Sequence, residues 1–274
     1  EYYLTRAEAE ILAARADDIV SASGDGLELV ELGSGSATKT RLIIDALLRR
    51  QPELLYRPID ISRAALDDCA ATLGVAYPRL TIEGVEGEYA EGIRRLGEAA
   101  DAPRLILFLG SNIGNMSPGE AVAFLAAIRA NVRDVDSMLI GMDLRKDATV
   151  LEAAYDDSAG VTAAFNMNVL ERVNRELAAD FDVSTFRHAS RYDADEGRVE
   201  MHLVSEKTQA VDIGRIGLRV EFDAGETIHT ENSYKYAPEQ IDDIARRAGW
   251  RVRHRWLDNA DQFSVNLFTP ADAN

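Results

Sequence analysis

The stretch Leu27-Glu28-Leu29-Val30-Glu31-Leu32-Gly33-Ser34-Gly35-Ser36 joins an apolar strand to a turn of glycine and serine. A helical pattern follows at once, with apolar residues at 42, 43, 46 and 47. Glycines at a strand's carboxyl end let the backbone approach a ligand, and the following helix N-terminus favours polar or negative groups. The dinucleotide fingerprint would need a third glycine where Thr38 stands, so NAD is not favoured. The same turn could also be a plain strand–helix connection that binds nothing.

Outward from this turn, strands and helices alternate up to residue 147. We expect helices over Arg63–Leu73, with Ser62 as its N-cap, and over Pro118–Asn131, with proline in its first turn. The further strands are expected over Tyr56–Ile61, Leu80–Gly84, Arg104–Leu109 and Ser137–Leu144. This alternation predicts a parallel, doubly wound sheet with helices on both faces.

The pattern changes after residue 147. Residues 149–180 read as helical, with Val169, Val173 and Leu177 on one stripe. Period-two segments punctuated by glycines then predict an antiparallel sheet over 186–231, before a helix and two strands close the chain. We therefore expect an α/β domain of residues 1–147 and 235–274, interrupted by an α+β insertion of residues 148–234.

Composition and charge narrow the class of protein. The chain has 274 residues, 47 Asp and Glu against 30 Lys and Arg, and a net charge of −17. Such a surface repels phosphate backbones and anionic lipid, so we expect no nucleic-acid or membrane partner. The lone Cys69 cannot form an internal disulfide, and no apolar run is long enough to cross a bilayer. These features favour a cytoplasmic protein with a small-molecule substrate, and we expect a monomer.

Asp60 is the candidate that points to a nucleoside cofactor. It ends the second strand, where a carboxylate can accept hydrogen bonds from both ribose hydroxyls. The alternative is a turn residue beside Ser62. Because the chain has neither a P-loop lysine nor the dinucleotide glycine, S-adenosylmethionine is the leading cofactor candidate.

Two polar segments could bind a methyl acceptor. The loop Gly110–Asn115 leaves the fourth strand with two glycines, two asparagines and a serine, although small residues also suit a plain turn. Glu231 and Ser233 alternate, so both point to one side of a strand and could hold a ring with an N–H donor and an acceptor. They could equally be two exposed polar positions. The four histidines do not stand at metal-ligand spacing, so no metal is expected.

Taken together, these segments resemble the histidine-specific N,α-methyltransferases of ergothioneine biosynthesis, the EgtD family. The resemblance covers essentially the whole chain and is densest in ELGSGSATKTR, FLGSNIGN, AYDDSAGVTAAFNMNVLERVNRELAADFDV, RVEMHL and FDAGETIHTENSYKY. It implies a Rossmann-type class I methyltransferase with an inserted α+β substrate-binding domain. It also implies transfer of three methyl groups from S-adenosylmethionine to the α-amine of L-histidine, which gives hercynine.

The resemblance also assigns residues. The cofactor-binding set it implies is Gly33, Lys39, Asp60, Glu88 and Tyr89, with Asp60 on the ribose and Tyr89 over the adenine. Glu88 stands where the family commonly has aspartate. The substrate-binding set it implies is Tyr2, Gly110, Asn115, Tyr155, Met201, Glu231 and Ser233. Asn115 and Tyr155 are the expected catalytic residues, which act by positioning the amine and the carboxylate. Met201, Glu231 and Ser233 would bind the imidazole.

Three alternatives stay open from the sequence. The first is a related methyltransferase that acts on another amino acid or an aromatic amine. The second is the methyltransferase half of a larger sulfoxide-synthase fusion, and the third is a catalytically silent protein that keeps the cofactor fold. The chain also opens without methionine inside a helical pattern, so we expect a preceding segment, where the family has another tyrosine for the amine.

Overall fold

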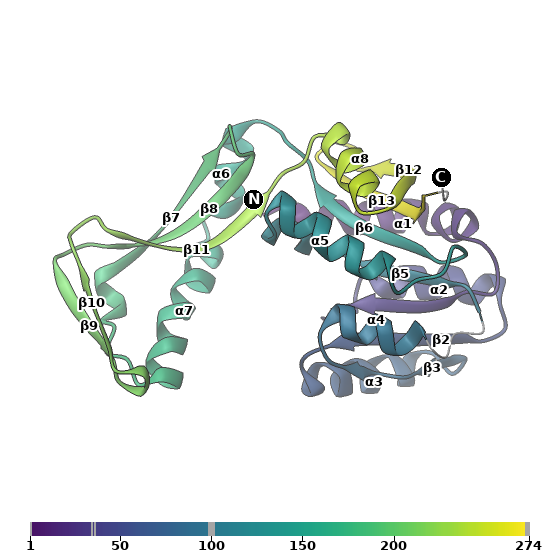
Figure 1. The fold of residues 1–274 in the computed structure, drawn as a ribbon, viewed down its shortest axis with the longest axis horizontal. Coiled ribbons are helices and arrows are strands. Elements are labelled where there is room, and N and C mark those ends of the chain that lie inside the picture. The colour runs from purple at the N-terminus through teal and green to yellow at the C-terminus, as the bar shows by residue number, and fades with distance from the viewer. Residues whose placement is uncertain (1, 34, 36, 98–101, 272–274) are drawn as a thin grey trace. The chain divides into compact units, whose positions relative to one another are not determined.

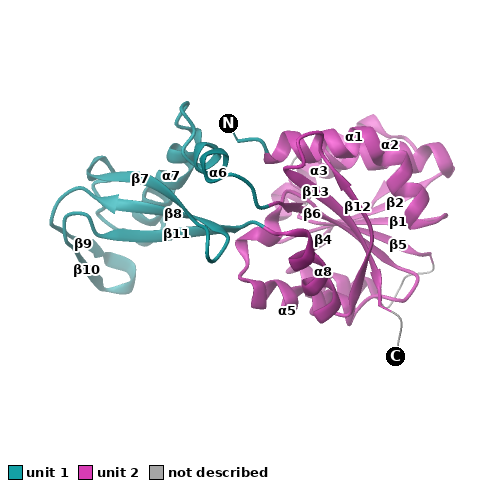
Figure 2. Cartoon of the chain, turned by 90° about the horizontal axis from the view of Figure 1, so that it is seen from above, with its two compact units in different colours: residues 1–3, 145–235 teal, residues 4–144, 236–274 magenta. Residues whose placement is uncertain are grey.

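The computed structural model describes residues 2–33, 35, 37–97 and 102–271. The chain forms two compact units, one of residues 1–3 and 145–235 and the other of residues 4–144 and 236–274 (Figure 2). We call them the insertion unit and the sheet unit. In the described part of the chain, no helix combines the length and the apolar character that a membrane span requires.

The sheet unit is built on one mostly parallel sheet (Figure 1). Its strands lie in the order β12-β13-β6-β5-β1-β2-β3. The short β4 pairs with the last residues of β2, Ile59 and Asp60, after the part of β2 that pairs with β3. Their bounds are β1 Glu28–Leu32, β2 Leu54–Asp60, β3 Leu80–Ile82, β4 Val85–Glu86, β5 Arg104–Phe108, β6 Ser137–Asp143, β12 Trp250–Leu257 and β13 Phe263–Pro270. Only β12 and β13 run antiparallel to their neighbours. The predicted parallel sheet is confirmed, and β1, β5 and β6 are buried along their whole length, as strands covered on both faces should be.

Helices cover both faces of this sheet, with α1 and α2 on one side and α5 and α8 on the other (Figure 2). The helices of this unit are α1 Leu4–Ser23, α2 Thr40–Arg50, α3 Arg63–Ala76, α4 Tyr89–Gly97, α5 Pro118–Arg129 and α8 Pro238–Arg247. Their starts follow local sequence signals. The Ser62 hydroxyl accepts from the Ala65 N–H at 3.3 Å, as predicted, and Ser117 and Glu120 form a reciprocal capping box.

The insertion unit is an α+β fold. Its three-stranded antiparallel sheet has the order β11-β8-β7, and β9 and β10 form a separate ribbon. The elements are α6 Ala148–Tyr155, α7 Val161–Leu177, β7 Phe186–Asp193, β8 Arg198–Ser205, β9 Gln209–Ile213, β10 Leu218–Phe222 and β11 Thr227–Tyr234. A small core holds helix α7 to the sheet and the ribbon, and it includes Leu170, Phe186, Leu203 and Phe222.

The segment expected to be helical over 149–180 is helical over most of its length, but it is broken into two helices. Helix α6 ends at Tyr155, and α7 begins only after Gly160, whose φ of +70° lies in the left-handed region. The Asp157 carboxylate accepts from the backbone N–H groups of the new first turn and so starts the second helix. Within α7, Val173 and Leu177 pack against the core as predicted, whereas Val169 is 40% exposed and Leu170 is buried in its place.

Candidate functional site

The glycine turn after β1 stands at the point where the strand order reverses. The neighbours of β1 are β2 on one side and β5 on the other, so the connections from β1 and β5 leave the sheet in opposite directions. In open α/β sheets, ligands bind outside the carboxyl ends of the strands at this switch point. Gly33, Asp60 and Gly110 follow or end these three strands, and the topology therefore places them at one edge.

Gly33 allows a close approach that another residue would block. Its φ is +81°, and its N–H donates to the Ile59 carbonyl at 2.9 Å, which ties the end of β1 to β2. A Cβ at this position would lie 2.7 Å from the Tyr89 hydroxyl. Tyr89 packs edge-on against Phe108 with ring centroids 5.8 Å apart, and burial raises its phenol pKa with a contribution from Asp60. Gly33, Asp60 and Tyr89 thus gather at the same edge.

The position of Asp60 is compatible both with the predicted ribose contact and with the alternative of a turn residue beside Ser62. One carboxylate oxygen accepts from the Ser62 N–H at 2.9 Å, which is the turn interaction that the alternative required. The same bond holds the half-buried carboxylate in a defined orientation at the end of β2. Glu88 is exposed at the start of α4, where its carbonyl accepts from the Gly92 N–H at 2.8 Å.

A glutamate that the sequence analysis missed connects two of the predicted residues. Glu8 of α1 is fully buried, and both of its carboxylate oxygens lie 2.9 Å from the Gly110 N–H. The Lys39 ammonium forms an ion pair with it. Burial raises the pKa of Glu8, and Lys39 opposes that shift. Lys39, which is expected to line the cofactor pocket, therefore pairs with Glu8. Glu8 also binds the backbone at the start of the 110–115 loop.

The sheet leaves room for Glu8 at one glycine. A Cβ on Gly141 of β6 would stand 1.8 Å from a Glu8 oxygen, so only glycine allows the carboxylate to cross the strand. The sequence signal for this arrangement is a glutamate among the apolar positions of the first helix. Periodicity alone could not name its partners.

A second buried carboxylate, Glu31, lies on β1 itself. Its oxygens accept from the Thr40 hydroxyl at 2.6 Å and from the Tyr56 phenol. Burial raises the pKa of Glu31 to about 7, although both hydroxyl bonds and the nearby Lys39 lower it. The strand that carries the glycine turn therefore contains a group that titrates near neutral pH.

The predicted loop after β5 is held on several sides. Ser111 has a φ of +56°, rare for a residue with a side chain, and its hydroxyl accepts from the Asp143 N–H at 3.0 Å. The Tyr236 phenol donates to the Ile113 carbonyl at 3.2 Å. Asn115 ends the short 3₁₀ helix of this loop, Asn112–Asn115, with its side chain exposed. The loop thus offers an exposed amide on a fixed backbone.

The predicted acceptor residues of the insertion unit gather around Tyr155. Its phenol lies 2.7 Å from the Ser233 hydroxyl, and both are buried. Tyr2 packs edge-on against Tyr155, with ring centroids 5.8 Å apart. The Lys235 ammonium donates to the Tyr155 and Ser233 oxygens at 2.8 Å each. The sequence analysis did not select this lysine.

Met201 and Glu231 face each other across β8 and β11. They are direct partners in the antiparallel register, so their side chains leave the same face of the sheet. Glu231 and Ser233 share this face because they are two residues apart, as predicted. Burial raises the pKa of Glu231, while the charge of Lys235 lowers it. Met201, Glu231 and Ser233 therefore form one surface with a carboxylate beside a hydroxyl.

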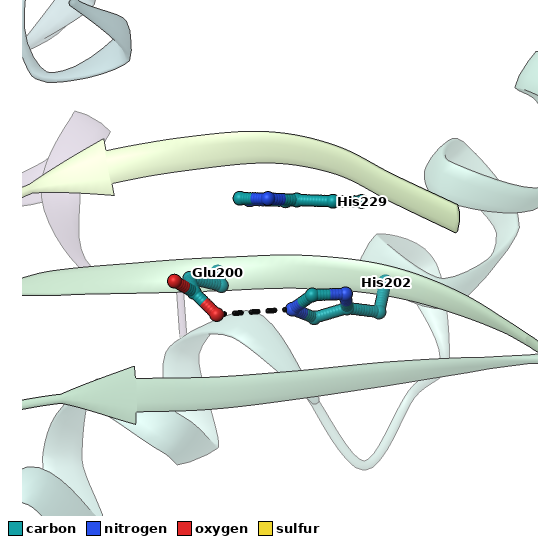
Figure 3. A group of neighbouring side chains, drawn as sticks. All are labelled: Glu200, His202 and His229. Carbon is teal, nitrogen blue, oxygen red and sulfur yellow. Dashed lines mark hydrogen bonds and ion pairs between the residues drawn. The ribbon is translucent and has the colours of Figure 1, made fainter. Parts of the chain in front are cut away.

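The opposite face of the same sheet brings together Glu200, His202 and His229, two of them on β8 and one on β11 (Figure 3). Spacing along the chain did not reveal this group. Their ligand atoms lie within 4.8 Å of one another. The Glu200 carboxylate, however, already accepts from Arg191 at 2.5 Å and Arg198 at 2.7 Å, which hold its pKa at about 2.

The two imidazoles of this group also stack, with centroids 4.7 Å apart and planes inclined by 24°. A metal ligand bond lies in the ring plane, so stacked rings do not aim at one ion. The cluster is an ion-pair network with a stacked histidine pair.

Asn115 and Tyr155, the two residues expected to position the acceptor, belong to different units. Within its own unit, Asn115 ends a braced loop, and Tyr155 lies beside Ser233. Their joint role stays a prediction.

A solved methyltransferase structure has a similar fold. The structure of the CcbJ methyltransferase from Streptomyces caelestis matches 95% of this chain and 90% of its own, with a TM-score of 0.52 and 15% identity, which shows a shared fold.

Two relatives are closer in sequence. The histidine N-alpha-methyltransferase of Mycolicibacterium smegmatis is 44% identical over 97% of this chain and 82% of its own length. The L-tryptophan methyltransferase of Psilocybe serbica is 30% identical over 96% of this chain and 80% of its own. The model of the histidine-specific, S-adenosylmethionine-dependent methyltransferases matches residues 1–270, and the chain belongs to that family.

Proposed function

We propose that this methyltransferase transfers three methyl groups from S-adenosylmethionine to the α-amine of L-histidine and releases hercynine, as the first step toward ergothioneine. The observation that carries the proposal is the surface of Met201, Glu231 and Ser233 beside Tyr155. A carboxylate and a hydroxyl two residues apart match the N–H and the bare nitrogen of an imidazole. The similarity to the mycobacterial histidine enzyme supports the same substrate.

The residues at the carboxyl edge of the sheet fit S-adenosylmethionine. Gly33 lets the Tyr89 hydroxyl come close to the turn, Asp60 presents an oriented carboxylate for the ribose, and Tyr89 offers an aromatic face. When bound, the cofactor supplies a methyl group on a sulfonium, whose leaving group needs no acid.

The protein's task toward the acceptor is alignment. The α-amine of a peptide N-terminus has a pKa of about 8, and the neighbouring carboxylate of a free amino acid raises that pKa, so a minor fraction of histidine carries the lone pair at neutral pH. Alignment of two bound reactants contributes roughly 7–11 kcal/mol at best. We assign Asn115 to positioning the amine and Tyr155 to positioning the acceptor on its carboxylate side, and no side chain to strong general-base catalysis. Bulk water accepts the proton that the monomethylated and the dimethylated ammonium each release before the next transfer, whereas the trimethylated product carries no N–H.

The charge of the chain supports a small polar substrate over a nucleic acid, because an excess of acidic groups repels phosphate. We also propose that the protein is a cytoplasmic monomer; its single cysteine suits a reducing compartment. Size-exclusion chromatography with light scattering tests the monomer directly.

The test of the proposed function is mass spectrometry of a reaction with S-adenosylmethionine and an equimolar mixture of the twenty amino acids. We expect one product, heavier than histidine by three CH2 units, because each methyl group replaces a hydrogen. Methylation of tryptophan or another amino acid instead would keep the enzyme class and overturn the histidine assignment. Binding of the cofactor without any methylated product would favour a silent relative.

A further inference from the structure

Lys235 is a buried cation in the middle of the predicted acceptor surface. Only 1% of the residue is exposed. It follows β11 directly, two residues after Ser233, and its ammonium lies 4.5 Å from the centroid of the Tyr155 ring. Together with its two bonds of 2.8 Å, this contact fixes the lysine against both hydroxyl groups. Burial of an ammonium costs desolvation free energy, so we ask which function its position serves.

The numbers of hydrogen-bond donors and acceptors on Lys235, Tyr155 and Ser233 limit how these three groups can bond to one another. An ammonium can only donate, whereas each hydroxyl carries one proton and two lone pairs. The 2.7 Å bond between Tyr155 and Ser233 uses one of the two hydroxyl protons. A phenol is a stronger acid than an aliphatic alcohol, so Tyr155 is the better donor in this bond. Ser233 then accepts from both Tyr155 and Lys235, and its own proton is directed away from them.

Ser233 is therefore restricted to donating toward a ligand. Glu231, on the same face, can only accept when ionised; burial raises its pKa, and the charge of Lys235 opposes that shift. The pair thus presents one donor and one acceptor side by side. A neutral azole ring carries the complement, one bare nitrogen and one N–H, whereas an indole carries an N–H alone.

We propose that Lys235 is a positioning residue that determines specificity, because it occupies the acceptor capacity of Ser233 and so selects a neutral azole side chain over an indole. This inference rests on the proposed function, in which the acceptor surface binds the side chain of the substrate. Lys235 does not touch the reacting atoms in this scheme; it acts through Ser233 and Tyr155.

The experiment compares Lys235→Met with the wild type by calorimetric titration with L-histidine, L-tryptophan and S-adenosylmethionine. Methionine keeps the length and the buried apolar stem but cannot donate. We expect histidine affinity to fall at least ~10-fold, the cost of one well-placed hydrogen bond. Cofactor affinity should stay within about twofold, and the preference for histidine over tryptophan should fall at least ~10-fold.

Two further variants separate this role from a structural one. Lys235→Gln retains N–H donors and should recover part of the preference for histidine. Lys207→Met removes an exposed lysine of the same unit and should leave all three affinities unchanged. A thermal melt of each variant checks that the insertion unit still folds.

An unchanged preference in Lys235→Met would overturn the inference, as would an equal loss for histidine and tryptophan. These outcomes differ from failure of the proposed function, which would appear as a wild-type enzyme that neither binds nor methylates histidine.

Discussion

Replacement of Glu31 by glutamine should remove a pH dependence from the stability of the sheet unit. In the folded protein, burial raises the pKa of Glu31 from 4.5 to about 7. The folded state therefore holds this proton more tightly than the unfolded chain. Between the two pKa values, the unfolded chain has lost this proton while the folded protein still holds it, so the free energy of unfolding falls as pH rises.

The magnitude follows from the size of the shift. Each unit of pKa difference corresponds to about 1.4 kcal/mol, so a displacement from 4.5 to about 7 amounts to roughly 3 kcal/mol. Over the accessible window from about pH 5 to about pH 7.5, about 2–3 kcal/mol of it should be lost. Glu31→Gln has no proton to lose. The constant cost of the amide between Thr40 and Tyr56 does not affect the slope.

The assay is urea unfolding followed by tryptophan fluorescence at several pH values. Both tryptophans of the chain, Trp250 and Trp256, lie on β12 of the sheet unit, so the signal reports the unit that contains Glu31. The difference in unfolding free energy, variant minus wild type, should grow by about 2–3 kcal/mol toward high pH. Glu53→Gln, on the surface of the same unit, is the control. Parallel pH curves for Glu31→Gln and wild type would refute the reasoning.

Three other predictions concern single residues. Glu231→Ala should lower the affinity for histidine at least ~10-fold and leave the affinity for S-adenosylmethionine unchanged in calorimetric titration, because only the imidazole ring loses its hydrogen-bond acceptor. An unchanged affinity for histidine would contradict the assignment. Asp60→Ala should lower the affinity for S-adenosylmethionine and leave the affinity for histidine unchanged in the same titration. Unaltered cofactor binding would exclude the ribose role. Gly141→Ala should destabilise the sheet unit by about 1–3 kcal/mol in urea, because its Cβ would overlap Glu8. Gly119→Ala, a helical position with open space around it, should not destabilise the unit.

Patterns that are local in sequence predicted much of this protein. The run from Leu27 to Ser36 sets a buried strand and a glycine turn, because apolar burial and backbone freedom are properties of neighbouring residues. The caps at Ser62 and Ser117 lie three residues from their partners. The shared face of Glu231 and Ser233 follows from the period of two in a strand. The family resemblance rests on the same linear order.

Partners that meet across long separations were decided only by the tertiary structure. Glu8 meets Lys39 at a separation of 31 residues and Gly110 at 102, and Lys235 meets Tyr155 at 80. Desolvation and charge pairing depend on what surrounds a group in space, so neither the raised pKa of Glu31 nor the buried lysine could be read from the chain. The break before α7 was missed because the backbone turn at Gly160 and the Asp157 cap outweigh a helical pattern that runs through them. Composition and periodicity thus determine which elements form, whereas packing selects the partners that give the polar groups their chemistry.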